Sequence, residues 1–240
     1  MSDALVIIPT YNEKENIEVI IKATFSQKKK FHILVVDDNS PDGTAKLVEK
    51  LILEFPNRLF LEKRLGKNGL GTAYIHGFKW AIAKKYDYII EMDADFSHNP
   101  TDLIKLYKAC AEDGADFSIG SRYLNNKINV VNWDIKRLFL SYFASKYVKI
   151  VTRIPIFDTT AGFVCYKRKV LERLALDKIK FVGYAFQIEM KFKAWKHKFK
   201  HKEVSIIFTD RKRGTTKMSG SIISEAIFGV IKMRIHGLPK

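Results

Sequence analysis

Short apolar runs rich in β-branched residues alternate with longer amphipathic stretches through the first half of the chain. The runs lie at residues 5–8, 33–36, 59–61, 88–92 and 116–119, and helical patterns follow the first four. This order predicts a doubly wound α/β fold, in which helices flank a mainly parallel sheet. Three polar side chains mark predicted helix starts: Thr10, Ser40 and Asn99.

The second half of the chain has a different pattern. Long amphipathic stretches cover residues 133–153, 186–199 and 221–235, and two more strands are predicted at 162–166 and 204–208. No segment rich in Pro, Gly or Ser separates the halves. We therefore expect a single domain over residues 1–240, in which 121–240 completes the sheet and adds C-terminal amphipathic helices.

Composition excludes several classes of protein. The chain has 240 residues, 47% of them hydrophobic, which is enough to bury a core and excludes global disorder. No stretch reaches the roughly 18 uncharged apolar residues of a membrane span, so no transmembrane helix is expected. Cys110 and Cys165 form no CxxC pair, which favours a reducing, cytoplasmic compartment over a disulfide framework or a zinc cluster.

The positive charge lies in one half of the chain. The formal net charge is +16 overall, but residues 1–120 carry 16 basic and 18 acidic side chains, and residues 121–240 carry 26 and 8. This segregation predicts that the C-terminal half meets an anionic partner. Nucleic acid, acidic lipid and a phosphorylated substrate all fit that description.

Two carboxylates follow the predicted strand at residues 88–92. Asp93 and Asp95 are two residues apart, and in an extended chain they would share one side with Ser97. Open α/β sheets bind ligands at the carboxyl ends of their strands. Paired carboxylates there suit Mg²⁺ or Mn²⁺, which complete their shells with water and substrate phosphates. An ordinary acidic turn is the alternative, because a lone DxD occurs by chance.

A second strand also ends in carboxylates, at Asp37 and Asp38, and the segment that follows it predicts a turn. Such a turn can accept hydrogen bonds from a ribose or a base, or it can simply precede a helix. Gly66, Gly69 and Gly71 mark a third segment. It is no Walker loop, and its glycines allow either close approach to a ligand or a flexible connection.

Six segments in order resemble the dolichol-phosphate mannose synthase family across essentially the whole chain. They are IPTYNE at 8–13, VDDNSPDGT at 36–44, GLGTAY at 69–74, MDAD at 92–95, GSRY at 120–123 and GTTKM at 214–218. That family consists of inverting family 2 glycosyltransferases with a GT-A fold, which transfer mannose from GDP-mannose to a polyprenyl (dolichyl-type) phosphate. The resemblance implies the same fold and activity here.

The resemblance also implies roles for individual residues on the donor side. Asp95 would be the principal metal ligand, assisted by Asp93. Ser97, a third candidate metal ligand, stands where some family members have Gln; its hydroxyl could ligate directly or through water, but more weakly. The residues implied to line the nucleotide pocket are Pro9, Tyr11, Glu13, Asp38 and Asp93.

On the acceptor side, the resemblance assigns the phosphate of the lipid to basic residues of the second half. Arg122, Arg137 and Ser141 would form that site, and Arg211 and Lys217 belong to the basic motif before the last helix. Independently, Arg137 and Ser141 are i and i+4, so on a helix they would share one face and could grip one phosphate. A solvated arginine beside an incidental serine is the alternative.

These inferences predict direct displacement at the anomeric carbon without a catalytic base, because a phosphate monoester is already ionised near neutral pH. Asp95, Arg122 and Arg137 would carry the catalysis. We expect peripheral association with the cytoplasmic face of a membrane, through amphipathic helices or a separate anchoring protein. The alternatives are a polyprenyl-phosphate glucosyltransferase or another family 2 enzyme, a weakly active scaffold subunit and, most remotely, a nucleic-acid-binding protein, although no nucleic acid partner is expected.

Overall fold

The computed structural model describes residues 2–124, 127–132, 134–209 and 229–235. Seven strands form the central sheet, in the order β10-β5-β9-β4-β1-β2-β3. Six of them run parallel, and β9 is antiparallel to both neighbours. Their bounds are β1 Ala4–Thr10, β2 His32–Asp37, β3 Leu59–Lys63, β4 Tyr88–Glu91, β5 Phe117–Ser121, β9 Val164–Lys167 and β10 His201–Ser205.

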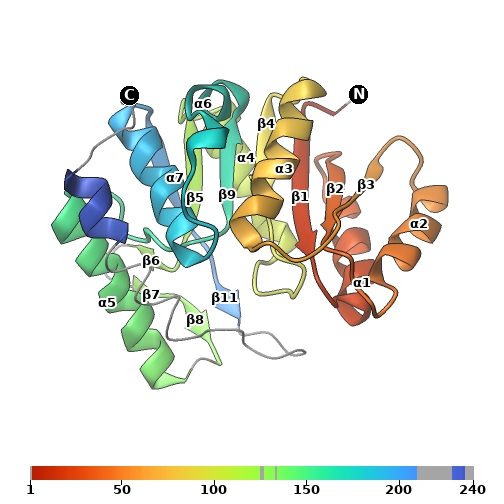
Figure 1. The fold of residues 1–240 in the computed structure, drawn as a ribbon, viewed down its shortest axis with the longest axis horizontal. Coiled ribbons are helices and arrows are strands. Elements are labelled where there is room, and N and C mark those ends of the chain that lie inside the picture. Colours follow the sequence, from red (N-terminus) through yellow and green to blue (C-terminus); the bar gives the residue numbers. More distant parts are fainter. Residues whose placement is uncertain (1, 125–126, 133, 210–228, 236–240) are drawn as a thin grey trace.

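Helices cover both faces of this sheet (Figure 1). On one face lie α1 (Lys14–Phe25), α2 (Thr44–Glu54) and α4 (Leu103–Ala111), the last preceded by the 3-10 turn η1 (Pro100–Asp102). On the other face lie α3 (Leu70–Ala83), α6 (Arg168–Arg173) and α7 (Tyr184–Lys196), with η2 (Leu176–Lys178) between the last two. The doubly wound prediction is therefore confirmed, with its sheet mainly parallel.

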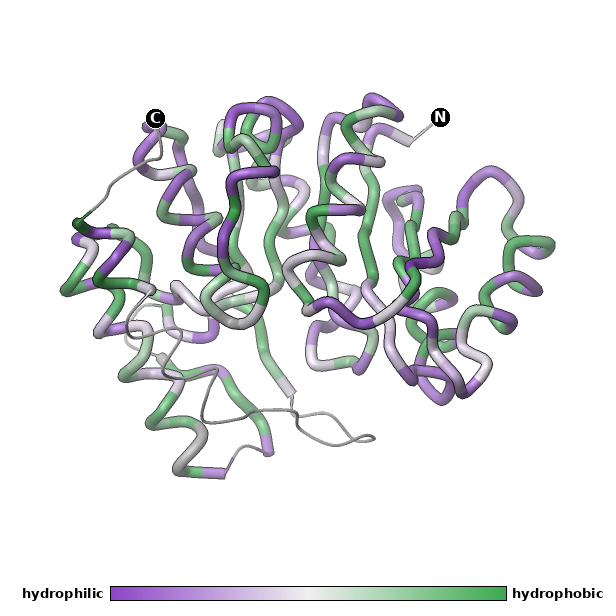
Figure 2. Tube along the Cα trace, in the orientation of Figure 1, coloured by the Kyte–Doolittle hydropathy of each residue, from purple (hydrophilic) through white to green (hydrophobic). Residues whose placement is uncertain are grey.

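Alternation along the strands explains the two layers. On β1, Leu5 and Ile7 pack with α3, whereas Val6 and Ile8 pack with α1 and α4. All four are fully buried. A strand buried on both faces is apolar throughout, as the continuous hydrophobic colouring of the central strands shows (Figure 2).

The second half adds a layer beside the sheet. Helix α5 (Ile135–Thr152) contributes Val148 to the core that α3, α6 and α7 share. A short helix over 229–235 contributes Val230 and Met233 to the same core. Two small sheets lie near α5: β6 (Tyr123–Leu124) with β7 (Lys127–Ile128), and β8 (Val130–Val131) with β11 (Phe208–Thr209). None of the helices within the described residues is long and apolar enough to cross a bilayer.

Several predicted boundaries shift. The strand predicted at 204–208 is β10 at His201–Ser205, followed by the separate short β11. The helix-start signal at Asn99 is confirmed, since its side chain accepts a hydrogen bond from the Thr101 amide at the start of η1. The signals at Thr10 and Ser40 are wrong, because the helices begin later, at Lys14 and Thr44, and both side chains bond Asp37 instead.

Candidate active site

Strands β1, β2, β4 and β5 point their carboxyl ends toward one edge of the sheet, and the predicted site residues follow those ends. Pro9 lies at the end of β1, Asp38 directly after β2, Asp93 shortly after β4 and Arg122 directly after β5. The parallel order thus gathers segments separated by more than 80 residues at the edge where open α/β sheets bind ligands.

The two carboxylates at the end of β2 have different surroundings. Asp37 is buried, and its side chain accepts hydrogen bonds from the hydroxyls of Thr10 (2.9 Å) and Ser40 (2.6 Å). Asp38 lies 3.1 Å from Nε of Arg64. Burial raises the pKa of Asp38, although the Arg64 charge opposes that rise. Asp38 is therefore the carboxylate of the pair that lies beside a cation.

The turn after β2 fixes the loop that follows β1. Backbone amides of Asn12, Glu13 and Lys14 donate to the side chains of Ser40 (3.0 Å), Thr44 (3.0 Å) and Asp42 (3.1 Å), respectively. These bonds satisfy backbone donors at the start of α1, which otherwise lack intrahelical partners. The loop after β2 therefore holds in place the loop after β1, which carries the predicted donor-site residues Tyr11 and Glu13.

The segment with Asp93 and Asp95 is a turn rather than an extended strand. Strand β4 ends at Glu91, the turn begins at Ala94, and Phe96 has a positive φ of 63°. The sequence argument from strand alternation is therefore wrong in its local geometry, because the chain leaves the sheet before Asp95. The turn itself is ordered, since the Ser97 amide donates to Oδ1 of Asp95 at 3.0 Å.

Two side chains that the sequence reasoning missed hold this turn. The hydroxyl of Tyr74, from α3, donates to Oδ1 of Asp93 at 3.1 Å. Nδ1 of His98 accepts from the Asp93 amide at 3.1 Å, and its ring stacks on Phe163 with centroids 4.7 Å apart. His98 is buried, and burial lowers its pKa, which favours the neutral ring that this acceptor role requires.

The donor set at this turn fits a hard divalent cation. Asp95 is nearly buried, Asp93 is about one-third exposed, and Oγ of Ser97 is buried without a hydrogen-bond partner among the described residues. That hydroxyl is a polar atom left for a ligand. In the described part of the chain no cluster of three or more Asp, Glu, His or Cys side chains could hold a metal. A cation here would depend on water and substrate oxygens, as Mg²⁺ and Mn²⁺ commonly do.

Arg122 lies close to this turn. His98 stands in an edge-to-face arrangement with Phe208 (centroids 5.5 Å apart), and the Arg122 guanidinium lies 5.5 Å from the centre of the same ring. Arg122 is buried and forms an ion pair with Asp158 at 2.7 Å. The turn that carries Asp93 and Asp95 and the first predicted acceptor arginine therefore share one aromatic contact.

The other predicted acceptor residues are placed less completely. Arg137 and Ser141 both lie on α5, as their spacing predicts, and Ser141 is partly exposed; the description does not extend to the Arg137 side chain. Arg211 and Lys217 lie outside the described residues. The roles of all these site residues stay predictions.

The third predicted segment has a packing role that sequence reasoning did not identify. Gly71 donates its amide to the Val182 carbonyl at 2.9 Å. A Cβ at position 71 would lie 2.7 Å from Cγ of Phe186, and one at position 69 would lie 3.0 Å from Cβ of Val182. These glycines let α3 approach the start of α7 closely.

The combination of this sheet, its carboxylate-bearing turns and its covered faces defines the GT-A fold of nucleotide-sugar glycosyltransferases. Solved structures agree. A mannosyltransferase from Pyrobaculum calidifontis in complex with GDP-Man and Mn²⁺ has a TM-score of 0.61 at 21% identity, over 88% of this chain and 58% of that one. Glucosyl-3-phosphoglycerate synthase from Mycobacterium tuberculosis reaches 0.67 at 15% identity, over 99% and 80%. This chain spans little more than half of the first structure.

Sequence comparisons give the family. The Glycosyl transferase family 2 model matches residues 5–175. Polyprenol monophosphomannose synthase of Mycolicibacterium smegmatis is 45% identical over 97% of this chain and 87% of its own length. Undecaprenyl-phosphate mannosyltransferase of Micrococcus luteus is 39% identical over 95% and 92%. The chain belongs to glycosyltransferase family 2, and the resemblance drawn from its motifs is confirmed.

Proposed function

We propose that this family 2 enzyme transfers mannose from GDP-mannose to a polyprenyl phosphate, with inversion at the anomeric carbon. The observation that carries the proposal is the 45% identity to a polyprenol monophosphomannose synthase over 97% of the chain. The second relative is also named for a mannosyl transfer to a polyprenyl phosphate. A mannosyltransferase with the same fold binds GDP-Man and Mn²⁺, which supports the donor and a divalent metal.

The nucleotide would bind at the carboxyl ends of β1 and β2. Pro9, Tyr11 and Glu13 would line this pocket, and the buried Asp38 would accept hydrogen bonds from the nucleoside. The charge of the nearby Arg64 opposes the rise that burial causes in the pKa of the Asp38 carboxyl. The tied loops of β1 and β2 preorganise these groups before the donor arrives.

Asp95, with Asp93 and Ser97, would hold Mg²⁺ or Mn²⁺ beside the diphosphate. When bound, such an ion neutralises the negative charge that develops on the leaving diphosphate. Tyr74 and His98 contribute by holding the Asp93 carboxylate and backbone in place. A ligand fixed in this way loses little entropy when it engages the ion.

The acceptor phosphate needs no catalytic base, since its second pKa is about 6 and it is already nucleophilic at neutral pH. The role of the protein is to hold two mutually repelling anions in line. Arg122 is placed beside the metal-binding turn, where a guanidinium can bind phosphate oxygens. Arg137, Ser141, Arg211 and Lys217 would complete this acceptor site.

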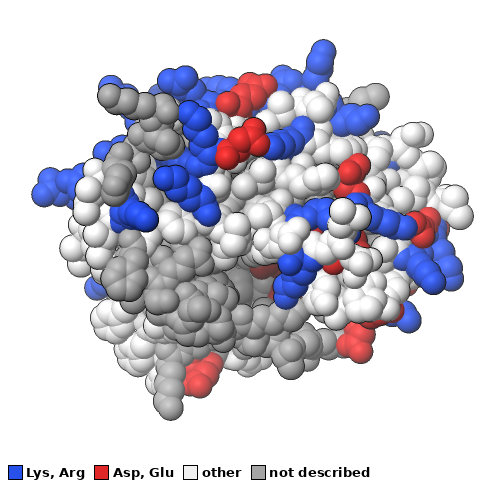
Figure 3. Space-filling view, viewed as in Figure 1, with Lys and Arg blue, Asp and Glu red and all other residues white. Residues whose placement is uncertain are grey.

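A membrane surface at the cytoplasmic side would present the lipid. Helix α5 exposes Ile135, Phe139, Leu140, Phe143 and Ile150. Lys146 and Lys149 belong to the same helix, and Lys and Arg side chains also gather over the region of α6 and α7 on the face in Figure 3. Apolar side chains that insert, together with cations that meet anionic headgroups, are the combination that gives peripheral binding.

Sugar transfer is the direct test. Radiolabelled GDP- and UDP-sugars are incubated with polyprenyl phosphate in detergent, with Mg²⁺, Mn²⁺ or EDTA. We expect a metal-dependent product from GDP-mannose alone, lost in Asp95→Ala and retained in the exposed control Asp177→Ala. Product only from another donor would assign a different sugar to the same mechanism, and no product from any donor would contradict the proposed activity.

The membrane proposal has its own test, sedimentation with vesicles containing anionic lipid. Phe139→Ser combined with Phe143→Ser should reduce the bound fraction severalfold. The double variant Leu53→Ser with Leu65→Ser changes two exposed leucines elsewhere and should bind normally. Equal binding of both double variants would refute a role for α5, and would favour a separate anchoring protein.

A further inference from the structure

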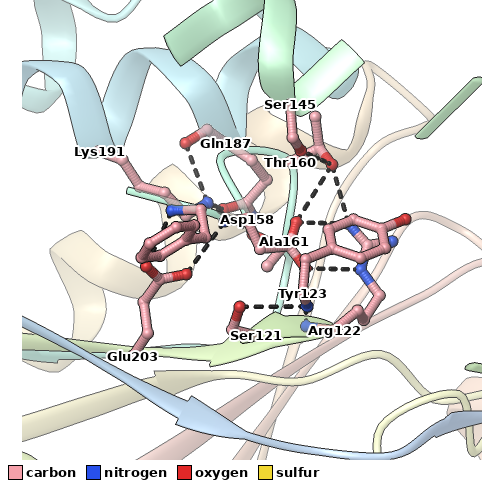
Figure 4. Close-up of polar contacts among 11 residues, drawn as sticks. Ser121, Arg122, Tyr123, Ser145, Asp158, Thr160, Ala161, Gln187, Lys191 and Glu203 are labelled. Carbon is pink, nitrogen blue, oxygen red and sulfur yellow. Dashed lines mark hydrogen bonds and ion pairs between the residues drawn. The ribbon is translucent and has the colours of Figure 1, made fainter. Parts of the chain in front are cut away.

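The Arg122 side chain is held by a loop that neither the motifs nor the comparisons assign to the reaction. Oδ2 of Asp158 accepts hydrogen bonds from both the backbone amide (2.9 Å) and Nε (2.7 Å) of Arg122. Oδ1 of Asp158 accepts from Nη2 at 2.7 Å, and Nη2 also donates to the Thr160 hydroxyl at 2.8 Å. Figure 4 shows Asp158 and Thr160 beside Arg122, where both side chains bond its guanidinium.

The loop itself is anchored from two other elements. On β10, the Glu203 carboxylate accepts from the amides of Phe157 (2.8 Å) and Asp158 (3.0 Å). On α7, the buried Lys191 donates through Nζ to the Ala161 carbonyl at 2.6 Å. The loop between these anchors cannot move without breaking charge-assisted hydrogen bonds, which are about twice as strong as neutral ones.

We propose that Asp158 and Thr160 are positioning residues that fix the Arg122 guanidinium for the phosphate of the lipid acceptor. This inference rests on the proposed function. A flexible arginine would lose side-chain entropy on meeting a phosphate, whereas the Arg122 side chain is ordered in advance by three hydrogen bonds to this loop, and the Arg122 backbone amide donates a fourth. Its contact with the Phe208 ring further restricts the plane of the guanidinium.

A different role for Asp158, that of a general base, does not fit its surroundings. Both of its oxygens already accept hydrogen bonds from Arg122, and its side chain is completely buried. Burial alone would raise the pKa of this carboxyl, but the charge and hydrogen bonds of Arg122 lower it below its usual value. A carboxylate with a lowered pKa is a weak proton acceptor, and the acceptor phosphate does not need one.

Thr160 offers the sharper test, because removing its hydroxyl leaves the ion pair intact. In Thr160→Val we expect the KM for polyprenyl phosphate to rise about tenfold while the KM for GDP-mannose stays unchanged. Thr160→Ser keeps the hydroxyl and should restore the acceptor KM. Thr159→Val is the matched control, since the Thr159 hydroxyl is buried without a hydrogen-bond partner in the described part of the chain; it should behave as wild type.

Asp158→Asn provides a second test, in which the pH dependence of kcat is measured. A positioning role predicts a raised acceptor KM and a pH dependence of kcat parallel to that of wild type, whereas a general base predicts loss of the acidic limb of that profile. An unchanged acceptor KM in Thr160→Val, or an equal rise in both substrates' KM values, would overturn the proposal.

Binding separates this inference from the proposed function. Calorimetric titration with a short, soluble isoprenyl phosphate should show about tenfold weaker binding to Thr160→Val than to wild type and to Thr159→Val. This difference would support the positioning role even if no sugar donor gives product. Mannose transfer that is equally efficient in all three proteins would refute the positioning role and leave the proposed function standing.

Discussion

Gly71→Ala tests whether the glycine-rich segment serves packing between helices. The new Cβ would lie 2.7 Å from both Cγ and Cδ2 of Phe186. Carbon atoms prefer separations of about 3.5–4.0 Å, so the overlap approaches 1 Å. Phe186 cannot yield easily, because it is fully buried and its ring is stacked on Tyr74, with centroids 6.1 Å apart and planes 4° apart.

The expected magnitude is a difference of two terms. Overpacking a dense core costs about 1–3 kcal/mol, and Ala in place of a helical Gly returns about 0.5–1 kcal/mol. The net loss, about 1 kcal/mol from the centres of these ranges, should lower the thermal midpoint by about 2–4 °C in a domain of this size. Urea unfolding measures the loss directly, through a lower midpoint at an unchanged slope.

Two further variants make the result interpretable. Gly66→Ala places its Cβ where no atom lies within 4 Å, so its stability should change by less than about 0.5 kcal/mol. Phe186→Leu combined with Gly71→Ala should cost at least about 1 kcal/mol less than the sum of the single changes, because Phe186→Leu removes the ring that the new Cβ at position 71 meets. Additive losses, or a Gly71→Ala protein as stable as wild type, would refute the packing argument.

Three other changes have defined outcomes. Tyr74→Phe removes the hydroxyl that donates to Asp93 and should lower kcat/KM for GDP-mannose about tenfold; an unchanged value would exclude a role for this bond. Arg64→Gln removes the cation beside Asp38 and should raise the KM for GDP-mannose without changing that for the acceptor, as steady-state kinetics would show. Burial lowers the pKa of Lys191 to about 8, so the unfolded chain binds more protons at this site between that pH and 10.5, and stability should rise with pH across this window. Urea unfolding at several pH values should show a smaller rise in Lys191→Met, and an identical rise in both proteins would contradict the assignment.

The order of elements was predictable because it depends on local periodicity. Short continuous apolar runs became β1, β2 and β3, and each kept its place in the sheet. The separate prediction that side chains two residues apart share one side of an extended chain failed at the turn after β4. Alternation assumes an extended chain, whereas Phe96 adopts a positive φ that no local sequence rule indicates for a phenylalanine.

Candidate residues at strand ends were also found from sequence, because carboxylates directly after apolar runs are visible as a pattern. Which of two adjacent carboxylates is structural was not visible. Besides the nearby Ser40, Asp37 bonds Thr10, 27 residues away in the chain, whereas Asp38 pairs with Arg64, 26 residues away. Sequence patterns describe neighbours within a few positions, and these partners meet only when strands align.

The sequence by itself determined a parallel α/β sheet whose strand ends bear carboxylates, a basic second half, and the motifs of a glycosyltransferase family. Only the tertiary structure decided which polar side chains bond each other: Tyr74 with Asp93, and Arg122 with Asp158 and Thr160. The physical reason is that burial makes an unpaired charge costly, so a buried charge such as that of Arg122 is constrained by the partner that the fold brings within hydrogen-bonding distance. That partner is set by strand order and loop anchoring, which act across the whole chain.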